Sequence, residues 1–522
     1  MQRFRERQLG VIAAGHPLSA RVGADVLREG GNAVDAALGA VLASFACEPL
    51  LTGLGAGGYM LVVAPDRGPV LIDFFVQAPG TGGDPLSRGE LVPVSVSFGE
   101  AIQVFNVGVA SVGVYGMAAG LCEAASRFGR IPLSDLVVSA AALARGGVAL
   151  NEAQGYVVEL LGGIVTSTPE SAALFAPRGT LLRAGDTLKQ PELAETLERL
   201  GREGAAPFYT GDIGAAIAQW LGARGGMLTE ADLRSYEVVD RDPVRTCYRE
   251  REVLTNPPPS AGGILIARAL ALLDADAGPP AVSQIVSVME RTQSERTPEF
   301  LAGLGDPEFL ARFLARPADP SRPADPPRPA DRSHASGGGL GSTTHVAVLD
   351  RDGWGCSVTC SNGASSGVIV PGTGVHLNNM LGEQDLNPLG FHRHPPGRRL
   401  PSMMAPTIVL DGGEPRLALG SAGSNRIRSA ILQTIIRVVD ERLEAGDAVR
   451  APRVHFEDGV VYAEPGIDTA PLAQEGRAIS RFREPNLFFG GVQAVARDRD
   501  GSFSGGGDPR RGGAAIVVEA GG

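Results

Sequence analysis

Residues 316–331, "RPADPSRPADPPRPAD", restrict what this chain can fold into more than any other part of its sequence. Proline has a fixed φ and no backbone N–H, so this imperfect RPADP repeat excludes both a helix and a central strand. The glycine-rich stretch "SHASGGGLGS", 333–342, prolongs it. We therefore expect an exposed, extended linker over residues 316–342, with folded structure before and after it.

The composition is that of a globular protein with a net negative charge. Of the 522 residues, 43% are hydrophobic and 20% are charged, which suffices for a sizeable core in one or two domains. The net charge of −11 argues against a nucleic-acid partner. No stretch approaches the roughly 18 apolar residues that span a bilayer, and the apolar part of the N-terminus is too short for an export signal. We expect no membrane association and a cytoplasmic location.

Cysteine and histidine usage indicates neither a disulfide framework nor a metal site. The cysteines are odd in number and form no C-x-x-C pair: Cys47, Cys122, Cys247, Cys356 and Cys360. The last two would share one face of a strand as small buried hydrophobes. His392 and His394, in "FHRHPP", have no carboxylate or cysteine at ligand spacing. We expect no cofactor and no metal.

Local patterns before the linker predict mostly helices. Residues 16–47 and 123–147 have apolar residues at helical spacing, and Asn32 is a candidate helix cap after a "GG" stop. Residues 59–76 alternate around a "PDRG" turn and predict a hairpin. From 190 to 275 the pattern is interpreted as helical again, with a helix beginning after "PPPSAGG".

Local patterns after the linker predict short strands and one clear helix. The strands are "THVAVLD", "GCSVTC", "TIVLDGG" and "PRLALGS", and the helix is "SNRIRSAILQTIIRVVDERLEAG". Helices combined with hairpin-linked strands favour stacked helix and sheet layers over alternating βαβ units.

The two threonines at the end of the linker suggest a particular chemistry. A threonine that becomes the first residue of a chain carries its own general base, because a free α-amino group titrates at about 7.7–8.0. Its hydroxyl then serves as the nucleophile in acyl-enzyme chemistry, provided that the preceding peptide bond is broken first. Alternatively, Thr343 and Thr344 simply begin a strand after a flexible loop. The motif "TTH" by itself leaves both interpretations open.

Ten ordered segments along nearly the whole chain resemble the γ-glutamyltransferase family of N-terminal-nucleophile hydrolases. They are "HPLSARVGADVLREGGNAVDAALGAVLA", "GLGAGGYMLV", "FGRIPLSDLVVSAAALARGG", "LTEADLRSYEVVDRDPVR", "PPPSAGGILIARAL", "TTHVAVLDRDGWGCSVT", "LNNMLGE", "APTIVLDGG", "GSAGSNRI" and "GDPRRGGAA". The resemblance implies an α+β fold, a four-layer αββα sandwich. It also implies self-cleavage between Ser342 and Thr343 into a large chain, 1–342, and a small catalytic chain, 343–522, that stay together.

The resemblance assigns the catalytic roles residue by residue. Thr343 corresponds to the nucleophile, and its freed amine to the base. Thr359 and Ser361 fall where the family places hydroxyls close to the nucleophile. Gly423 and Ser424 fall on the pair whose backbone N–H groups form the oxyanion hole. A backbone donor persists at Ser424 provided that its φ and ψ do not require glycine. His345, next to the threonines, is expected to be a packed strand residue, since the amine already supplies the base.

The substrate positions depart from the family more than the catalytic ones. Phe75 stands where the family has an arginine that holds the α-carboxylate of a glutamyl group, and losing a charge-assisted bond of about 1.5–3 kcal/mol should weaken such binding about tenfold to a hundredfold. Glu383 stands at the family's aspartate, which contacts the substrate's α-amino group, and Ser402 is retained. The other changes are Met403 for a second serine, Met380 for a glutamine and Gly363 for an asparagine, with Asn362 as a neighbour of the lost amide.

These departures indicate a more open and more apolar pocket, behind a loop from Gln384 to Pro401 that looks shorter than in family members with a lid. Within that loop Arg393, Arg398 and Arg399 offer a new carboxylate anchor, although a solvated basic loop is the favoured interpretation.

The sequence thus predicts a self-processing amidohydrolase or acyltransferase that cleaves a γ-glutamyl or related acyl amide. An acylase acting on non-glutamyl amides, similar to cephalosporin acylases, is the main alternative, and a non-catalytic scaffold is a weaker one. The expected partners are a small-molecule amide and the two chains of the precursor themselves.

Overall fold

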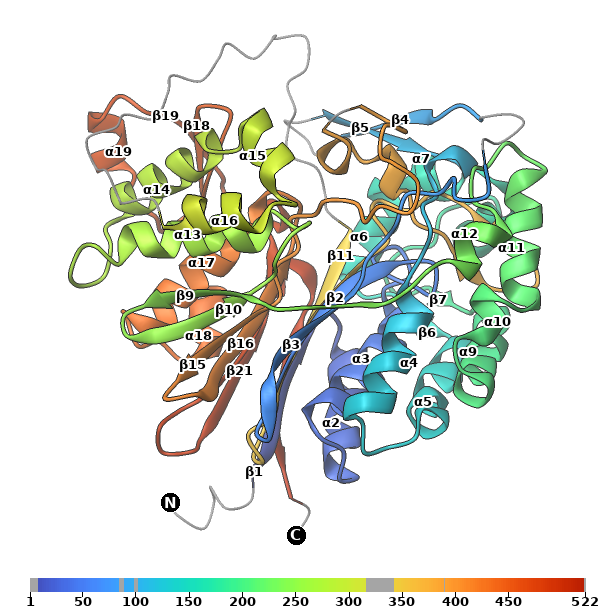
Figure 1. Ribbon diagram of the computed structural model, residues 1–522, viewed down its shortest axis with the longest axis horizontal. Helices are drawn as coiled ribbons and strands as arrows, with labels where there is room; N and C mark the ends of the chain where they lie inside the picture. The colour runs from blue at the N-terminus through green and yellow to red at the C-terminus, as the bar shows by residue number, and fades with distance from the viewer. Residues whose placement is uncertain (1–7, 84–88, 98–101, 316–341, 389, 521–522) are drawn as a thin grey trace.

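A computed structural model describes residues 8–83, 89–97, 102–315, 342–388 and 390–520 (Figure 1). The linker predicted at 316–342 lies outside the described residues except for Ser342.

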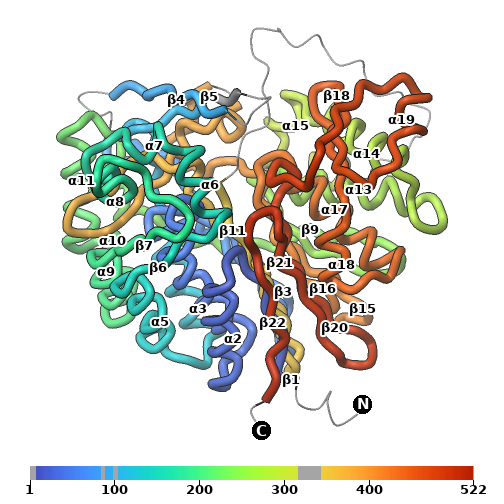
Figure 2. The backbone as a smooth tube through the Cα atoms, turned by 180° about the vertical axis from the view of Figure 1, so that it is seen from behind, coloured from blue at the N-terminus to red at the C-terminus, as the bar shows by residue number. Residues whose placement is uncertain are grey.

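Two antiparallel sheets, packed face to face, form the centre of the molecule (Figure 1). The first has the order β22 (Ala514–Glu519), β1 (Gln8–Ala14), β11 (Thr343–Asp350), β12 (Gly355–Ser361), β2 (Gly57–Ala64), β3 (Arg67–Phe74) and β8 (Val239–Arg241). The second has the order β21 (Phe503–Gly507), β20 (Gly491–Arg497), β16 (Glu414–Ala422), β15 (Thr407–Asp411), β10 (Arg251–Thr255) and β9 (Val244–Tyr248). The first and last strands of the chain, β1 and β22, pair with each other (Figure 2).

Helices cover the outer face of each sheet (Figure 1). On the first sheet lie α2 (Pro17–Arg28), α3 (Ala33–Cys47) and α4 (Met117–Phe128), with α5 (Leu133–Gly146) and α9 (Pro191–Glu203) packed outside them. On the second lie α13 (Gly262–Leu273), α17 (Arg426–Val439) and α18 (Ala445–Arg450), with α14 (Val282–Ser294) outside. The predicted α+β fold, a four-layer αββα sandwich, is confirmed.

The remaining elements surround these four layers. The helices are α6 (Glu152–Leu160), α7 (Gly162–Val165), α8 (Pro169–Phe175), α10 (Ala206–Tyr209), α11 (Asp212–Gly222), α12 (Glu230–Arg234), α15 (Pro298–Gly303), α16 (Pro307–Leu314) and α19 (Ala470–Gln474). The strands pair as β4 (Val92–Ser97) with β5 (Ile102–Val107), β6 (Val148–Ala149) with β7 (Thr187–Leu188), β13 (Ile369–Val370) with β14 (Val375–His376), and β17 (Val454–Glu457) with β18 (Val460–Ala463) and β19 (Ala478–Arg481). Short 3₁₀ turns occur at Val109–Ser111, Met380–Gly382, Gln384–Leu386, Leu487–Phe489 and Pro509–Arg511.

Most local predictions agree with the structure. The first helical region forms α2 and α3, and Asn32 caps α3 in a capping box with Asp35. The hairpin is β2–β3. The helical interpretation of 190–275 is wrong between residues 239 and 255, where β8, β9 and β10 occur. The burial of β9 alternates from residue to residue, although its sequence, VRTCY, does not alternate between apolar and polar residues.

Strand β11 sets the orientation of the threonines. Successive side chains of a strand point to opposite faces. Val346 and Val348 pack into the core under the helices of the first sheet, whereas Ala347 and Leu349 pack into the core toward the second sheet. The same alternation turns Thr344 toward the helix layer and Thr343 toward the layer between the sheets, at the end of the strand.

Candidate active site

A small hollow surrounds Thr343, where β11 begins and β12 ends. Its wall is built by the ends of strands and by loops from both halves of the chain. The apolar members are Phe75, Met380, Leu386, Met403, Met404 and Ile427, and the others are Thr343, Ser361, Gly363, Glu383, Asp385, Ser402 and Ser424. Residues that lie up to about 350 positions apart in the sequence therefore meet at one place.

A chain of hydroxyl contacts joins Thr343 to the peptide bond before it. The Oγ1 of Thr343 donates to the Oγ of Ser361 at 3.2 Å. The Oγ of Ser361 donates in turn to the carbonyl oxygen of Ser342 at 2.7 Å and accepts the N–H of Gly363 at 3.1 Å. Strand pairing enforces this arrangement, because Thr343 and Ser361 are direct cross-strand partners.

The turn at Gly423 and Ser424 forms another wall of the hollow. Gly423 has φ +122° and Ser424 has φ +51°. The left-handed conformation costs a non-glycine residue roughly 1–2 kcal/mol, and Ser424 recovers part of this through a 2.7 Å hydrogen bond from its Oγ to the Oδ2 of Asp385. Within the described part of the chain, the N–H groups of Gly423 and Ser424 donate to no protein acceptor. Both donors thus remain available.

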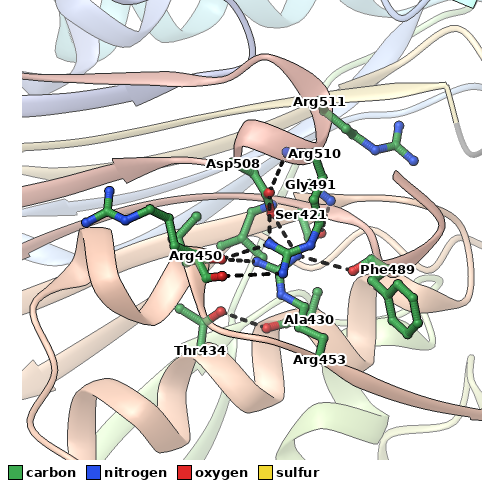
Figure 3. Close-up of polar contacts among 12 residues, drawn as sticks. Ser421, Ala430, Thr434, Arg450, Arg453, Phe489, Gly491, Asp508, Arg510 and Arg511 are labelled. Atoms are coloured by element: carbon green, nitrogen blue, oxygen red, sulfur yellow. Dashed lines mark hydrogen bonds and ion pairs between the residues drawn. The ribbon is translucent and has the colours of Figure 1, made fainter. Parts of the chain in front are cut away.

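A buried ion-pair network holds the strands behind this turn (Figure 3). Asp508 accepts the N–H of Val492 at 2.9 Å and pairs with Arg453 at 2.7 Å and Arg510 at 3.2 Å. The neighbouring Ser421 accepts the N–H of Gly491 at 3.2 Å through its Oγ. These contacts fix β20 against β16, from whose end the turn emerges.

Two polar groups face the hollow from the opposite side. The Oε1 of Glu383 accepts the N–H of Ala364 at 2.9 Å. Burial, reinforced by the nearby Asp385 carboxylate, raises the pKa of Glu383 to about 7. The Oγ of Ser402 accepts the N–H of Met404 at 2.9 Å, so its own proton is free to be donated.

The apolar wall is firmly packed. Phe75 is fully buried and stacks on Tyr59, with ring centroids 5.2 Å apart. Met380 and Met403 are also buried. A ligand group in contact with this wall meets hydrocarbon and sulfur in place of hydrogen-bond donors.

The geometry agrees with what sequence comparison finds. The pattern of the gamma-glutamyltranspeptidase family matches residues 19–518. The chain belongs to this family.

Relatives in the family include proteins named as acylases and proteins named as glutathione hydrolases. The chain is 31% identical to the acylase ACY 1 proenzyme of Pseudomonas sp. (strain SE83), over 98% of this chain and 94% of that one. It is 30% identical to the glutathione hydrolase proenzyme of Bacillus subtilis (strain 168), over 98% of this chain and 91% of that one. The cephalosporin acylase from Bacillus halodurans has the same fold, with a TM-score of 0.80 over 99% of this chain and 97% of that chain at 23% identity.

Three residues assigned from the family resemblance do not line the hollow. Thr359 is fully buried and its Oγ1 lies 2.8 Å from the Nδ1 of His345. Asn362 is also fully buried, with its N–H donated to Leu51 and its side-chain amide turned toward the carbonyl of His376. Asn362 therefore does not replace the lost amide at 363. Gly423 contributes only its backbone, next to Ser424.

The basic loop differs from the favoured interpretation at one position. Arg393 and Arg398 are exposed, but Arg399 is buried and pairs with Asp73 at 3.3 Å, which also binds Arg241 at 2.7 Å. None of the three loop arginines lines the hollow around Thr343. Arg398 and Arg399 face a separate groove of about 1140 Å³, which shares no lining residue with that hollow.

Several residues near Thr343 carried no local signal in the sequence. Asp385, Leu386, Met404 and Ile427 complete the wall of the hollow. On the other face of β11, the Oγ1 of Thr344 donates to the buried carboxylate of Glu48, 3.1 and 3.2 Å from its two oxygens. Burial raises the pKa of Glu48 to about 7. Of these residues, only Asp385 had a clue in the sequence, because it lies two positions after Glu383 in a short loop.

Histidines 392 and 394 each contact a backbone carbonyl, those of Ala110 and Leu386, at 2.9 Å. Among the residues that the structure describes, no cluster of three potential ligands is close enough to hold a metal ion. No helix in the described ranges has the length and apolar character to cross a membrane.

Proposed function

We propose that this protein cleaves its own chain between Ser342 and Thr343 and then acts as an amidohydrolase or acyltransferase through Thr343. The observation that supports this most strongly is the contact of Ser361 with both the Thr343 hydroxyl and the Ser342 carbonyl.

In the first reaction, the Oγ1 of Thr343 attacks the carbonyl carbon of Ser342. Its proton passes to the Oγ of Ser361, which gives its own proton toward the carbonyl oxygen of Ser342 as that oxygen gains charge. The C–N bond then breaks as that proton passes from the oxygen to the nitrogen and the C=O bond re-forms, leaving an ester on Thr343 and a free amine at its nitrogen. Water hydrolyses the ester, which produces a carboxylate at Ser342 and regenerates the Thr343 hydroxyl.

In the second reaction, the new α-amine of Thr343 removes the proton of its own hydroxyl. The hydroxyl attacks the carbonyl carbon of an amide, and the free N–H groups of Gly423 and Ser424 stabilise the oxyanion. The amine part of the substrate leaves with the proton that the Thr343 α-amine had taken up. Water or another amine then cleaves the acyl-Thr343 ester. One residue thus serves as both nucleophile and base.

The substrate is a γ-glutamyl or related acyl amide, and the wall of the hollow favours an acyl group without a free amino-acid head. Phe75 offers no charge to an α-carboxylate, and Glu383 is only half ionised near pH 7, so it attracts an ammonium group weakly. The 31% identity to a protein named as an acylase supports this preference. A γ-glutamyl donor such as glutathione is the second candidate, supported by the relatives named glutathione hydrolase.

Denaturing gels, N-terminal sequencing and intact mass measurement of the purified chain test the proposal. We expect two chains with a new N-terminus at Thr343, and an uncut chain for Thr343→Ala. Ser361→Ala should slow the cut by about 100-fold or more, because the proton relay is lost. Ser361→Thr keeps the hydroxyl and should retain most of the rate.

Cys360→Ala provides a matched control, since Cys360 neighbours Ser361 but packs under the helix layer. An uncut wild-type chain would contradict the proposal, as would a Thr343→Ala variant that is still cut. Equal cleavage rates for Ser361→Ala and Cys360→Ala would remove Ser361 from the mechanism.

A further inference from the structure

A cluster of buried charged groups lies beside the Ser424 wall of the hollow, outside the machinery described above. It contains Arg296, just after α14, and Arg426 and Arg428 in the first turns of α17. Two carboxylates, Asp385 and Glu457, lie close enough to influence the pKa of all three arginines.

Asn425 connects this cluster to the hollow. It directly follows Ser424, and its Oδ1 accepts a hydrogen bond from the Nη1 of Arg296 at 3.3 Å. Its Nδ2 donates to the Oε1 of Glu457 at 2.7 Å. Asp385 lines the hollow itself. The guanidinium of Arg296 therefore lies one side chain away from the turn that carries the free N–H groups.

Two of these arginines lack a carboxylate partner. Among the described residues, no Asp or Glu forms an ion pair with Arg296 or Arg428. Arg428 donates from Nη2 to Gln293 at 2.5 Å, while its buried Nε has no acceptor. Burial lowers the pKa of both groups, to about 10 for Arg428, which still leaves it protonated at neutral pH.

The cluster is therefore cationic, with three guanidinium groups against two carboxylates. The carboxylate of Glu457 already has two partners. Its Oε1 accepts a hydrogen bond from Asn425, and its Oε2 lies 3.3 Å from the Nε2 of His455. The carboxylate of Asp385 accepts a hydrogen bond from the Ser424 hydroxyl. A buried cation without a carboxylate partner, such as Arg428, is costly, and an anion bound close to it relieves that cost. Arg296 is partly exposed, which makes it the member that a ligand can reach.

We propose that Arg296, backed by Arg428, forms a carboxylate-binding subsite for the substrate of the Thr343 reaction. The subsite replaces the charge that is absent at Phe75, and it favours amides that carry a carboxylate at a position other than the α-carbon of a glutamyl group. This inference rests on the proposed function, and its ligand chemistry is a carboxylate on either the acyl group or the leaving amine.

Binding of glutarate by the mature wild-type protein, measured by titration calorimetry, tests the subsite without any turnover. We expect glutarate to bind and the neutral 1,5-pentanediol not to bind. Arg296→Gln should weaken glutarate binding about 10- to 100-fold, and Arg296→Lys should retain part of it, because the charge remains. Arg312→Gln, on the exposed face of α16, is the matched control and should bind as the wild type does.

Matched anilides then locate the carboxylate. Glutaryl anilide carries the carboxylate on the acyl group, and the amide 4-(pentanoylamino)benzoate carries it on the leaving amine. Pentanoyl anilide has no carboxylate. Arg296→Gln should lower kcat/KM about 10- to 100-fold for one of the first two and leave the neutral anilide unchanged. Thermal unfolding of each variant confirms that it is folded.

Two outcomes overturn the subsite: no glutarate binding by the wild type, or an Arg296→Gln variant that binds glutarate as the wild type does. Equal losses on all three anilides would also overturn it. Failure of the proposed function is distinguishable, because it would show as no turnover of any amide while glutarate still binds in an Arg296-dependent manner.

Discussion

Individual residues decide what the hollow recognises. Phe75 and Met380 give the hollow an apolar surface, and Phe75 is held in place by its stack on Tyr59. Glu383 keeps a carboxylate at the wall, but burial makes it a weak acid. The site that we propose would therefore have little attraction for either charged group of a glutamyl head.

The pH dependence of substrate binding should reveal the state of Glu383. Its pKa is raised to about 7, so the carboxyl is neutral below that pH and anionic above it. The KM for γ-glutamyl anilide, relative to that for glutaryl anilide, should fall as the pH rises through about 7, because only the first substrate carries an ammonium group. Because the Thr343 amine acts on both substrates, its titration affects both KM values alike and cancels in their ratio. Glu383→Gln should make the ratio independent of pH, and a dependence that persists in this variant would assign the effect to another group.

At the scale of elements, a buried ion-pair network supports the turn at Gly423 and Ser424. Asp508 directly follows β21. It pairs with Arg453, which precedes β17, and accepts the N–H of Val492, the second residue of the hairpin partner β20. Arg453 and Asp508 are almost completely buried. Their charges are tolerated only as a pair, because each would otherwise lose hydration without compensation.

Removing Asp508 should destabilise the fold more than removing an exposed acid. In the uncut Thr343→Ala background, Asp508→Asn is expected to lower the free energy of unfolding by about 3–5 kcal/mol, because Arg453 remains buried without its partner. Asp447→Asn removes an exposed pair with Arg450 and should cost no more than about 1 kcal/mol. Urea denaturation followed by circular dichroism measures both. Equal losses of unfolding free energy in the two variants would show that the buried Asp508–Arg453 pair stabilises the fold no more than the exposed pair does.

For the whole molecule, the proposed cut before Thr343 would divide the chain but not the fold. In the first sheet β11 pairs with β1 on one side and with β12 on the other, and β12 pairs with β2. In the second sheet β10 pairs with β15. Strands of the proposed large chain, 1–342, and small chain, 343–522, therefore intermingle in the first sheet and meet at the β15–β10 pair in the second, so each chain would complete the core of the other.

The two chains should consequently remain associated after processing. We expect a single species of the full mass in native gel filtration and two chains only in denaturant. The fragment 343–522 expressed alone should not fold, because β11, β12 and β15 would lack the partners β1, β2 and β10. Separation of the chains under native conditions, or a stable isolated fragment, would contradict this interleaved arrangement.

The sequence alone determined the features that depend on local pattern and on ordered motifs. Helical spacing and caps predicted α2 and α3, alternation predicted the β2–β3 hairpin, and the threonine motif with its ordered neighbours indicated the family, the fold and Thr343 as the candidate nucleophile. These features follow from interactions among residues close in sequence, or from motifs long enough to be distinctive. In β9 the burial alternates but the residue types do not, so local pattern did not distinguish this strand from the helical region around it.

Only the tertiary structure decided which side chains meet. Ser361 joins Thr343 and Ser342 because β11 and β12 pair in one register, while Thr359, two residues away, contacts His345. Arg399, interpreted from the sequence as part of a solvated loop, is buried against Asp73. The pairing of Arg296 with Asn425 joins segments 129 residues apart. Such contacts depend on how the layers pack, and packing sums many weak interactions that no short stretch of sequence encodes.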